Sequence, residues 1–414
     1  MFFSGPSIKY LPKIRNTVHF WAIAFALGLL GVTGCGNKFF IPECQAYNTC
    51  PTTTCTTGTT CTTTPGSGGA YSSFAYVANG NQGTLAGFPI PSTTFTSLTG
   101  SSYTLGTPPS ALAATPSGKL LYVATSAGSI FVYVINANGT LVLGNSSQPV
   151  TSTLNPTWMS IDPKGNWLFL VSNSSPQLLV FQINPANGVL TQTSQGTILL
   201  DSGTGNPTQV YVTPNDKNVY VGLGISGMDG FQFDSINGTL SNHIHLRTLI
   251  NGGSADNTIA SDNNSSYLFV GEAGSGVRVL SIGSNGTVNE ISGSPFHQSG
   301  LGASSQLGPI SIVVDKTNTY VYVAYRTSNE IIGYTMGTGG TLTALSSSPF
   351  QTGSGPDAMS LDPTGKYLLV TSLYGNPDLE VFSFDATVAG KLDSVVSTPT
   401  GVQPAGAIAV AVVP

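Results

Sequence analysis

The sequence predicts an all-β protein, a seven-bladed β-propeller with four-stranded antiparallel blades and a ring closed by the C-terminal strand. Three observations support this fold class. A short β-rich signature recurs seven times at intervals of 46 to 53 residues. Turns rich in glycine, several of them Asn-Gly, separate the apolar runs, as is typical of antiparallel hairpins. The first copy lacks an opening strand, and the chain ends in an unpaired one, from Pro404 to Pro414.

The first complete copy of the repeated unit spans Pro109 to Leu143. A Thr-Pro-Ser-Gly turn at residues 115–118 separates its first two apolar runs. Asn138-Gly139 separates its last two, and we expect a type I′ turn there because both residues tolerate a positive φ. The four expected strands lie within residues 111–114, 120–124, 129–135 and 140–142.

The later copies repeat this order. The turn before the second strand reads Asp-Pro-x-Gly at 162–165 and 362–365, with weaker copies at 213–216, 261–264 and 315–318. Proline presets φ for such a turn, and a final Gly or Asn accepts the left-handed conformation that closes it. The second-strand signature itself occurs at Tyr76-Val77, Tyr122-Val123, Phe169-Leu170, Tyr220-Val221, Phe269-Val270, Tyr322-Val323 and Leu369-Val370.

The two ends of the chain favour a ring over a linear solenoid. A four-stranded unit of this size cannot bury both faces alone, so neighbouring units must pack against one another. The first copy begins at its second strand, Phe74 to Val77, and the surplus opening strand lies at the C-terminus, Ala407 to Val412. Pairing these two segments leaves no exposed sheet edge, whereas a linear stack would leave one at each end.

The composition excludes several classes of function. Charged residues make up only 7% of the chain, against a usual value of about 25%. The net charge of −5 argues against a nucleic-acid partner, which would require a basic face. The sequence contains no phosphate-binding loop, dinucleotide fingerprint or nucleophile-elbow motif. We therefore expect no cofactor, and a monomer.

The N-terminus predicts export. Lys9, Lys13 and Arg15 precede an apolar run from Val18 to Val32 that is short for a membrane span. The run ends in Val-Thr-Gly-Cys35, which resembles the lipobox of bacterial lipoproteins. This resemblance implies that residues 1–34 are a lipoprotein signal peptide and that Cys35 is lipidated, anchoring the protein in the bacterial cell envelope by lipid alone. The alternative is an ordinary signal peptide with an incidental cysteine.

Residues 35–70 read as a tether between this anchor and the folded body, residues 71–414. Ten threonines lie between positions 52 and 64, and a Gly-Ser-rich stretch follows, a composition that cannot bury a core. An even number of cysteines in an exported chain favours two disulfides, with three possible pairings. A metal site is less favoured because no C-x-x-C pair occurs. The four cysteines are Cys44, Cys50, Cys55 and Cys61.

The repeats resemble those of a known family. The Tyr-Val-Ala-Asn of residues 76–79, the Asp-Pro-x-Gly turns and the Gly-Thr-Leu hairpins are similar to bacterial lactonase-like seven-bladed propellers, which include the phosphogluconolactonase type. The resemblance implies a lactone as substrate. That type carries Pro-Arg-His at the opening of one inner strand and Asn-Glu in the next strand. The corresponding opening here reads Asp256-Asn257-Thr258, without Arg or His, and Glu272 lies near the expected glutamate.

Candidate site residues follow from the loops expected on one face of the ring. Glu272, His297 and Arg326 come from one blade, the connection after it and the next blade, so they could converge. Lactone opening needs a general base to activate water and a donor for the developing oxyanion, which a carboxylate or imidazole and an arginine supply. Four further loop residues are candidates for ligand binding: Asn79, Asn173, Asp229 and Tyr374.

Other polar groups are less distinctive. His243 and His245 would share one strand face, but no third ligand is evident, so we predict no metal site and expect exposed or packing histidines. Asp201, Asp256 and Asp357 could help to hold a cation in the mouth of the ring, but single carboxylates on scattered blades are usually turn or cap residues, which is what we expect here. Two functions remain open. The first is hydrolysis of a sugar or related lactone, and the second is non-catalytic binding of a protein or glycan at the cell surface.

Overall fold

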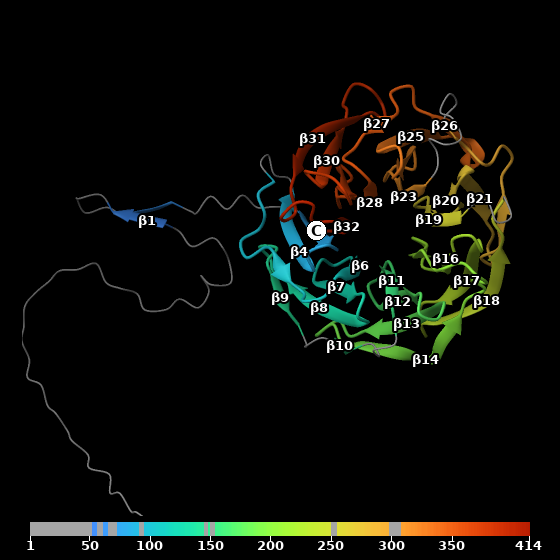
Figure 1. Ribbon diagram of the computed structural model, residues 1–414, viewed down its shortest axis with the longest axis horizontal. Coiled ribbons are helices and arrows are strands. Elements are labelled where there is room, and N and C mark those ends of the chain that lie inside the picture. Colours follow the sequence, from blue (N-terminus) through green and yellow to red (C-terminus); the bar gives the residue numbers. More distant parts are fainter. Residues whose placement is uncertain are drawn as a thin grey trace, which may run out of the picture.

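The chain forms seven antiparallel sheets arranged as a ring about a central axis (Figure 1), which confirms the predicted fold class. The signal peptide, Cys35, Cys44 and Cys50 lie outside the described residues, so the predictions for them are not tested by the fold. Among the described residues no helix has the length and apolar character needed to cross a membrane. The computed structural model describes residues 52–55, 61–64, 73–90, 95–144, 148–149, 154–249, 255–297 and 308–414.

Two short strands lie within the segment expected to be a tether. β1 (Thr52–Cys55) and β2 (Cys61–Thr64) pair antiparallel, with Cys55 opposite Cys61 in the backbone register. The remaining strands all belong to the ring.

The inner strand of each blade faces the axis. These strands begin at the connection from the preceding blade, and six of the seven have alternating or partly exposed burial patterns because one side lines the channel. The inner strands are β6 (Pro109–Ala114), β11 (Pro156–Ile161), β15 (Gln209–Val212), β19 (Ala255–Ser261), β23 (Pro309–Val314), β28 (Pro356–Leu361) and β32 (Ala407–Val413).

The second strands carry the repeated signature and form the core between blades. Their central residues are all buried, as expected for strands covered on both faces. They are β3 (Ser73–Asn79), β7 (Leu120–Thr125), β12 (Trp167–Ser172), β16 (Asn218–Gly222), β20 (Tyr267–Ala273), β24 (Tyr320–Tyr325) and β29 (Tyr367–Ser372).

The third and outer strands complete each blade, and the outer ones lie at the rim (Figure 1). The third strands are β4 (Thr84–Ile90), β8 (Ser129–Ile135), β13 (Gln177–Ile183), β17 (Met228–Asp234), β21 (Gly276–Ile282), β25 (Glu330–Met336) and β30 (Leu379–Phe384). The outer strands are β5 (Tyr103–Thr104), β9 (Leu141–Leu143), β14 (Leu190–Leu199), β18 (Thr239–Leu246), β22 (Val288–Glu290), β26 (Leu342–Ala344) and β31 (Leu392–Thr398), with the short additions β10 (Gln148–Pro149), β27 (Phe350–Gln351) and the 3₁₀ turn η3 (Thr338–Gly340).

The C-terminal strand closes the ring, as predicted. β32 pairs antiparallel with β3, from Phe74 opposite Val413 to Asn79 opposite Ala407. The same sheet continues through β4 to β5, so its four strands come from the two ends of the chain.

Aspartates hold the turns that lead into the second strands. The Asp362 carboxylate accepts hydrogen bonds from the backbone N–H groups of Lys366 and Tyr367, each at 2.7 Å, and Asp162, Asp262 and Asp315 do the same in their own turns. This confirms the turn reading of the Asp-Pro-x-Gly pattern. In the copy predicted at residues 261–264 the left-handed residue is Ser265, because the turn starts at Asp262, one residue later than the prediction.

The late hairpins differ from the prediction. In the turn at Asn138-Gly139 only the glycine has a positive φ, 79°, so the type I′ prediction is wrong. Asn136 N–H instead donates to Thr140 O across a longer loop, and the Gly139 N–H donates back to Asn136 O. The Asn138 side chain accepts a hydrogen bond from the Thr140 N–H at 3.1 Å. Asn-Gly therefore marks the hairpin by a side-chain bond followed by one left-handed residue.

Glycines in these late hairpins contact the second strand of the preceding blade. Four buried tyrosines each donate their hydroxyl to the carbonyl of a hairpin glycine 63 to 68 residues later. The glycines are also necessary for packing, since a Cβ on Gly238 would lie 2.2 Å from the Trp167 ring and one on Gly390 would lie 2.6 Å from Tyr320. The four bonds are Tyr76 to Gly139 (2.7 Å), Tyr122 to Gly188 (2.9 Å), Tyr220 to Gly286 (3.0 Å) and Tyr322 to Gly390 (2.8 Å).

Removing one of these hydroxyls should destabilise the ring. In Tyr220→Phe the buried Gly286 carbonyl loses its partner, and we expect the free energy of unfolding to fall by about 1–3 kcal/mol. Urea denaturation followed by tryptophan fluorescence measures the change. Tyr374→Phe, which removes the hydroxyl of an exposed tyrosine, is the control and should stay within about 0.5 kcal/mol of the native chain. Equal stability of the two variants would contradict a role for the inter-blade bond.

Candidate functional site

A cavity of about 340 Å³ lies on the axis of the ring, lined by residues from the inner strands of all seven blades. Most of these strands contain a β-bulge near their start, as between Pro156 and Trp158 or between Pro356 and Ala358. The bulged residue has no direct partner on the neighbouring strand, and each such residue is half-buried at the cavity wall. One residue per blade occupies this position: Ser110, Thr157, Thr208, Asn257, Ile310, Asp357 and Ile408.

This set was missed by the sequence analysis, although the sequence contains a signal for it. In five of the seven blades the cavity residue directly follows a buried proline, at Pro109, Pro156, Pro207, Pro309 and Pro356. Proline suits the start of a strand beside a bulge because it has no N–H to donate to the ladder. A Pro-x dipeptide recurring once per repeat therefore identifies the residue that points toward the axis.

Arg326 and Asp357 form an ion pair at the wall of this cavity. Arg326 directly follows β24, and Asp357 is the bulged residue of the neighbouring blade's inner strand, so the pair bridges two blades. Burial lowers the pKa of Arg326, and the nearby Tyr374 opposes that shift. Asp357 was expected to be a turn or cap residue, and that expectation is wrong because it lies within β28.

A second group of charges includes Asp256, the residue before Asn257, and its members Asp256, Glu272 and Arg278 are buried. Arg278 Nη1 is 3.1 Å from Glu272 Oε2, and its Nη2 is 3.2 Å from Glu290 Oε2. Asp256 is fully buried opposite Glu272 in the strand register, which corrects the expectation of a turn or cap. Burial and then the negative charge of Glu272 raise the pKa of Asp256 to about 8. This buried carboxyl group lies at a position where five other blades have proline.

The three predicted catalytic residues have different surroundings. Arg326 lines the cavity, whereas Glu272 is fully buried in its ion pair with Arg278 and does not line it. His297 is exposed and lies beside Gly276, the strand partner of Glu272, with its Cβ 3.4 Å from where a Cβ on Gly276 would be. Glu272 and His297 therefore lie on opposite sides of β21, and Arg326 pairs with Asp357. A catalytic role for the three together stays a prediction.

The four predicted ligand-binding residues lie in different surroundings. Asn79 is buried and bonded to Thr400 through both ends of its amide, at 3.1 and 2.7 Å, so it ties β3 to the segment before the closing strand. Asn173 is half-buried in the loop after β12, and its Oδ1 has no hydrogen-bond partner among the described residues. Tyr374 is exposed over Gly355, two residues before Asp357.

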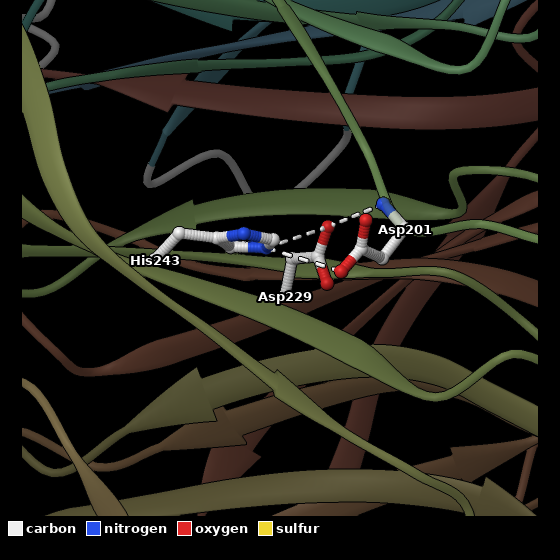
Figure 2. A group of neighbouring side chains, drawn as sticks. All are labelled: Asp201, Asp229 and His243. Atoms are coloured by element: carbon white, nitrogen blue, oxygen red, sulfur yellow. Dashed lines mark hydrogen bonds and ion pairs between the residues drawn. The ribbon is translucent and has the colours of Figure 1, made fainter.

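Asp229 lies near the N-terminal end of β17 and faces the two histidines of β18 (Figure 2 shows Asp229 with His243). His245 Nδ1 is 2.7 Å from Asp229 Oδ1, and His243 Nε2 is 3.3 Å from Asp229 Oδ2. Asp201, from the connection before β15, has its Oδ2 4.0 Å from His243 Nε2. The expectation that the histidine pair has no third ligand nearby is therefore wrong. Asp229 had been predicted to bind a ligand, but the contact of Asp201 and Asp229 with these histidines was not predicted, because neither aspartate is adjacent to them in the sequence.

Comparison with known proteins agrees with this architecture. The family described as "Lactonase, 7-bladed beta-propeller" matches residues 70–204 and 201–410. The chain belongs to this lactonase family of seven-bladed propellers. No curated protein sequence matches the chain. The resemblance to the lactonase-like propellers drawn from the repeats is thereby confirmed.

Solved structures show the same fold at low sequence identity. The periplasmic gluconolactonase of Pseudomonas aeruginosa is 16% identical with a TM-score of 0.67, and the match covers 83% of this chain and 99% of that one. A protein assigned as a 6-phosphogluconolactonase from Bacteroides fragilis is 18% identical with a TM-score of 0.66, covering 85% and 100%. A similarly assigned protein from Bacteroides uniformis is 16% identical with a TM-score of 0.66, covering 82% and 99%.

The buried carboxyl group of Asp256 should make stability depend on pH. Its pKa is higher in the folded than in the unfolded chain, so between about pH 4 and pH 8 the folded state holds one more proton and stability falls as the pH rises. Its contribution to the slope is at most about 1.4 kcal/mol per pH unit. Urea denaturation from pH 5 to 9 should show a flatter profile for Asp256→Asn. The exposed Asp393→Asn measures the effect of losing one acidic residue, and an unchanged slope in Asp256→Asn would contradict the assignment.

Proposed function

We propose that the protein hydrolyses a sugar or related lactone in its axial cavity, with Asp357 as the general base and Arg326 as the group that binds the developing oxyanion. One observation carries the proposal. In a chain with few charged residues, an arginine and an aspartate meet at the wall of a cavity to which all seven blades contribute. Membership of the lactonase family supports the choice of reaction.

The cavity suits a small polar substrate. A volume of about 340 Å³ lies at the lower end of the range for small-molecule sites. Thr157, Thr208, Gln209 and Asn257 line it. The two threonine hydroxyls donate to backbone carbonyls, so they can accept hydrogen bonds from sugar hydroxyls, and the amide groups can donate to them. Ile310 and Ile408 supply apolar surface on the same wall. This arrangement favours a lactone that carries hydroxyl groups over a purely aliphatic one.

The chemistry requires water, a base and an anion-binding group. Asp357 takes a proton from water as the water oxygen bonds to the lactone carbonyl carbon. The negative charge that moves to the carbonyl oxygen is stabilised by the guanidinium of Arg326, which has five N–H donors and can hold Asp357 and the substrate together. Collapse of the tetrahedral intermediate breaks the ring C–O bond, and the proton passes from Asp357 to the leaving oxygen. The product is a hydroxy acid.

Arg326 also gives this site a preference for acidic substrates. A guanidinium binds a carboxylate or phosphate through two parallel N–H bonds, whereas a lysine would bind as a point charge. The Bacteroides proteins are assigned as 6-phosphogluconolactonases, a name that refers to a phosphorylated substrate of those proteins. For this chain, comparing kcat/KM for phosphorylated and unphosphorylated lactones decides whether Arg326 binds only the oxyanion or also a phosphate group of the substrate.

Activity of the full chain on a panel of aldonolactones and phosphorylated lactones tests the proposal. We expect Asp357→Asn to lower kcat/KM by at least about 100-fold, because it removes the base, and Arg326→Lys to lower it by about tenfold or more. Asp393→Asn, which removes an exposed carboxylate on the outer strand β31, should leave kcat/KM unchanged.

Two outcomes would overturn the assignment. If Glu272→Gln abolishes turnover while Asp357→Asn retains it, the base is the glutamate predicted from the sequence. If the native chain turns over none of the lactones, the non-catalytic binding of a surface protein or glycan gains support.

We propose further that the protein works in the cell envelope, held by a lipid on Cys35. The support is the lipobox-like sequence that ends at this cysteine after a charged and apolar leader. Expression in a bacterial host with a labelled fatty acid should label the native chain and not Cys35→Ser. Label in both variants would contradict lipidation at this residue.

A further inference from the structure

We propose that Asp201, Asp229 and His243 bind a divalent transition-metal ion, with zinc as the best match to the ligands. One oxygen of each aspartate and one ring nitrogen of the histidine lie within 4.8 Å of one another. The three side chains point toward a common position (Figure 2). They lie away from the axial cavity, since none of them lines it. The site is therefore independent of the proposed lactone site.

The distances distinguish a metal site from a simple ion pair. Asp229 Oδ1 and His245 Nδ1 are 2.7 Å apart, the length of a charge-assisted hydrogen bond. The other oxygen of the same carboxylate is 3.3 Å from His243 Nε2, which is long for such a bond. Two ligands in a tetrahedral zinc site, each about 2.0–2.1 Å from the ion, are separated by about 3.3 Å. The Asp229–His243 pair already has that spacing.

Asp229 has the burial and the hydrogen bonds expected of a metal ligand. Its side chain is 0% exposed, and buried carboxylates are normally paired with cations or coordinate metals. Among the described residues its ion pairs are formed with histidines, not with lysine or arginine. Oδ2 also accepts the Asp201 N–H at 2.8 Å, which leaves its second lone pair free to point at an ion. His245 holds the opposite oxygen, so the orientation of the carboxylate is fixed from both sides, as is typical of metal ligands.

The histidine is held in place by the strand itself. β17 and β18 lose register between Gly230 and Gln232, where the outer strand has one extra residue and Asn242 adopts a φ of 49°. Bulges of this kind redirect neighbouring side chains. The His243 ring then stacks on the buried Phe231 with ring centroids 4.8 Å apart and planes at 10°. Stacking limits the imidazole to one plane and aims Nε2 at Asp229.

Asp201 completes the set and leaves the ion accessible. Its side chain is 61% exposed, and its Oδ2 is 4.0 Å from His243 Nε2, so a rotation of an unconstrained side chain brings it into the first coordination sphere. Three protein ligands leave a fourth position for water or another molecule. A separate cavity of about 220 Å³, lined by Ile198, Leu199 and Phe231, lies against His243 and provides room beside the ion.

The ligand types select the ion. Imidazole with two carboxylates suits zinc and other first-row metals, whereas calcium prefers six to eight oxygen ligands and magnesium prefers octahedral oxygen sites. A divalent ion also balances the two carboxylates.

Isothermal titration of the chelator-treated full chain with ZnCl₂ tests the proposal. We expect one site that millimolar MgCl₂ does not compete for, and an affinity at least about tenfold weaker in Asp201→Asn and in His243→Gln. His297→Gln and Asp393→Asn, which alter an exposed histidine and an exposed carboxylate elsewhere, are the matched controls and should bind as the native chain does. Asp201 and His243 are partly exposed, so circular dichroism should show both variants folded.

Cobalt distinguishes this site from the cysteines of residues 35–70. Co²⁺ bound by oxygen and nitrogen gives visible d–d bands without the intense ultraviolet charge-transfer band of a thiolate ligand. We expect visible bands that disappear in Asp201→Asn/His243→Gln and persist in His297→Gln. The proposal is overturned if the double variant keeps the native zinc affinity, or if all bound cobalt shows thiolate charge transfer.

Discussion

The contact between the second strand of one blade and the hairpin of the next is the constraint on which the ring depends. At Gly139, Gly238, Gly340 and Gly390 an aromatic ring lies where a glycine Cβ would be, and in four interfaces a tyrosine hydroxyl bonds the carbonyl of a hairpin glycine. Burial raises the pKa of these tyrosines, so they remain donors at physiological pH. Neither a tyrosine nor a glycine alone is informative, but the pair at a separation of 63 to 68 residues defines two neighbouring blades.

Variation among the interfaces shows which part of this contact is essential. Where the second strand has Phe169, no hydroxyl is available, and Trp167 instead donates its Nε1–H to the Ser235 carbonyl at 2.9 Å while covering Gly238. The shape of the contact is thus kept when its chemistry changes. Ring closure follows from the same geometry, because Phe74, from the first strand of the body, packs against Gly139 while its own strand pairs with the C-terminal one.

The fold could be predicted from the sequence because the same strand and turn patterns recur in the blades. Tyr220 and the Asp362 turn were placed correctly, since both act through neighbours in sequence or through the repeat period. The cavity was not predicted because a bulge shifts the strand register by one residue, which turns a side chain such as Asp357 to the opposite face. Asp201 was not placed beside His243 because that approach depends on the path of a connection between blades. No pattern within one repeat encodes that path.

Asp256, Asp357 and Arg326 are informative because other blades have uncharged residues at the positions of the two aspartates. Where Asp256 is buried, five blades have proline, and where Asp357 meets Arg326, other blades have Ser110, Thr157 or Ile310. Removing a charge from water costs several kcal/mol, and a buried ion pair seldom stabilises a fold more than well-packed apolar residues do. The propeller therefore does not require these groups for its stability, since neighbouring blades fold without them. The pair of Arg326 and Asp357 at the axial cavity therefore supports the proposed lactone site.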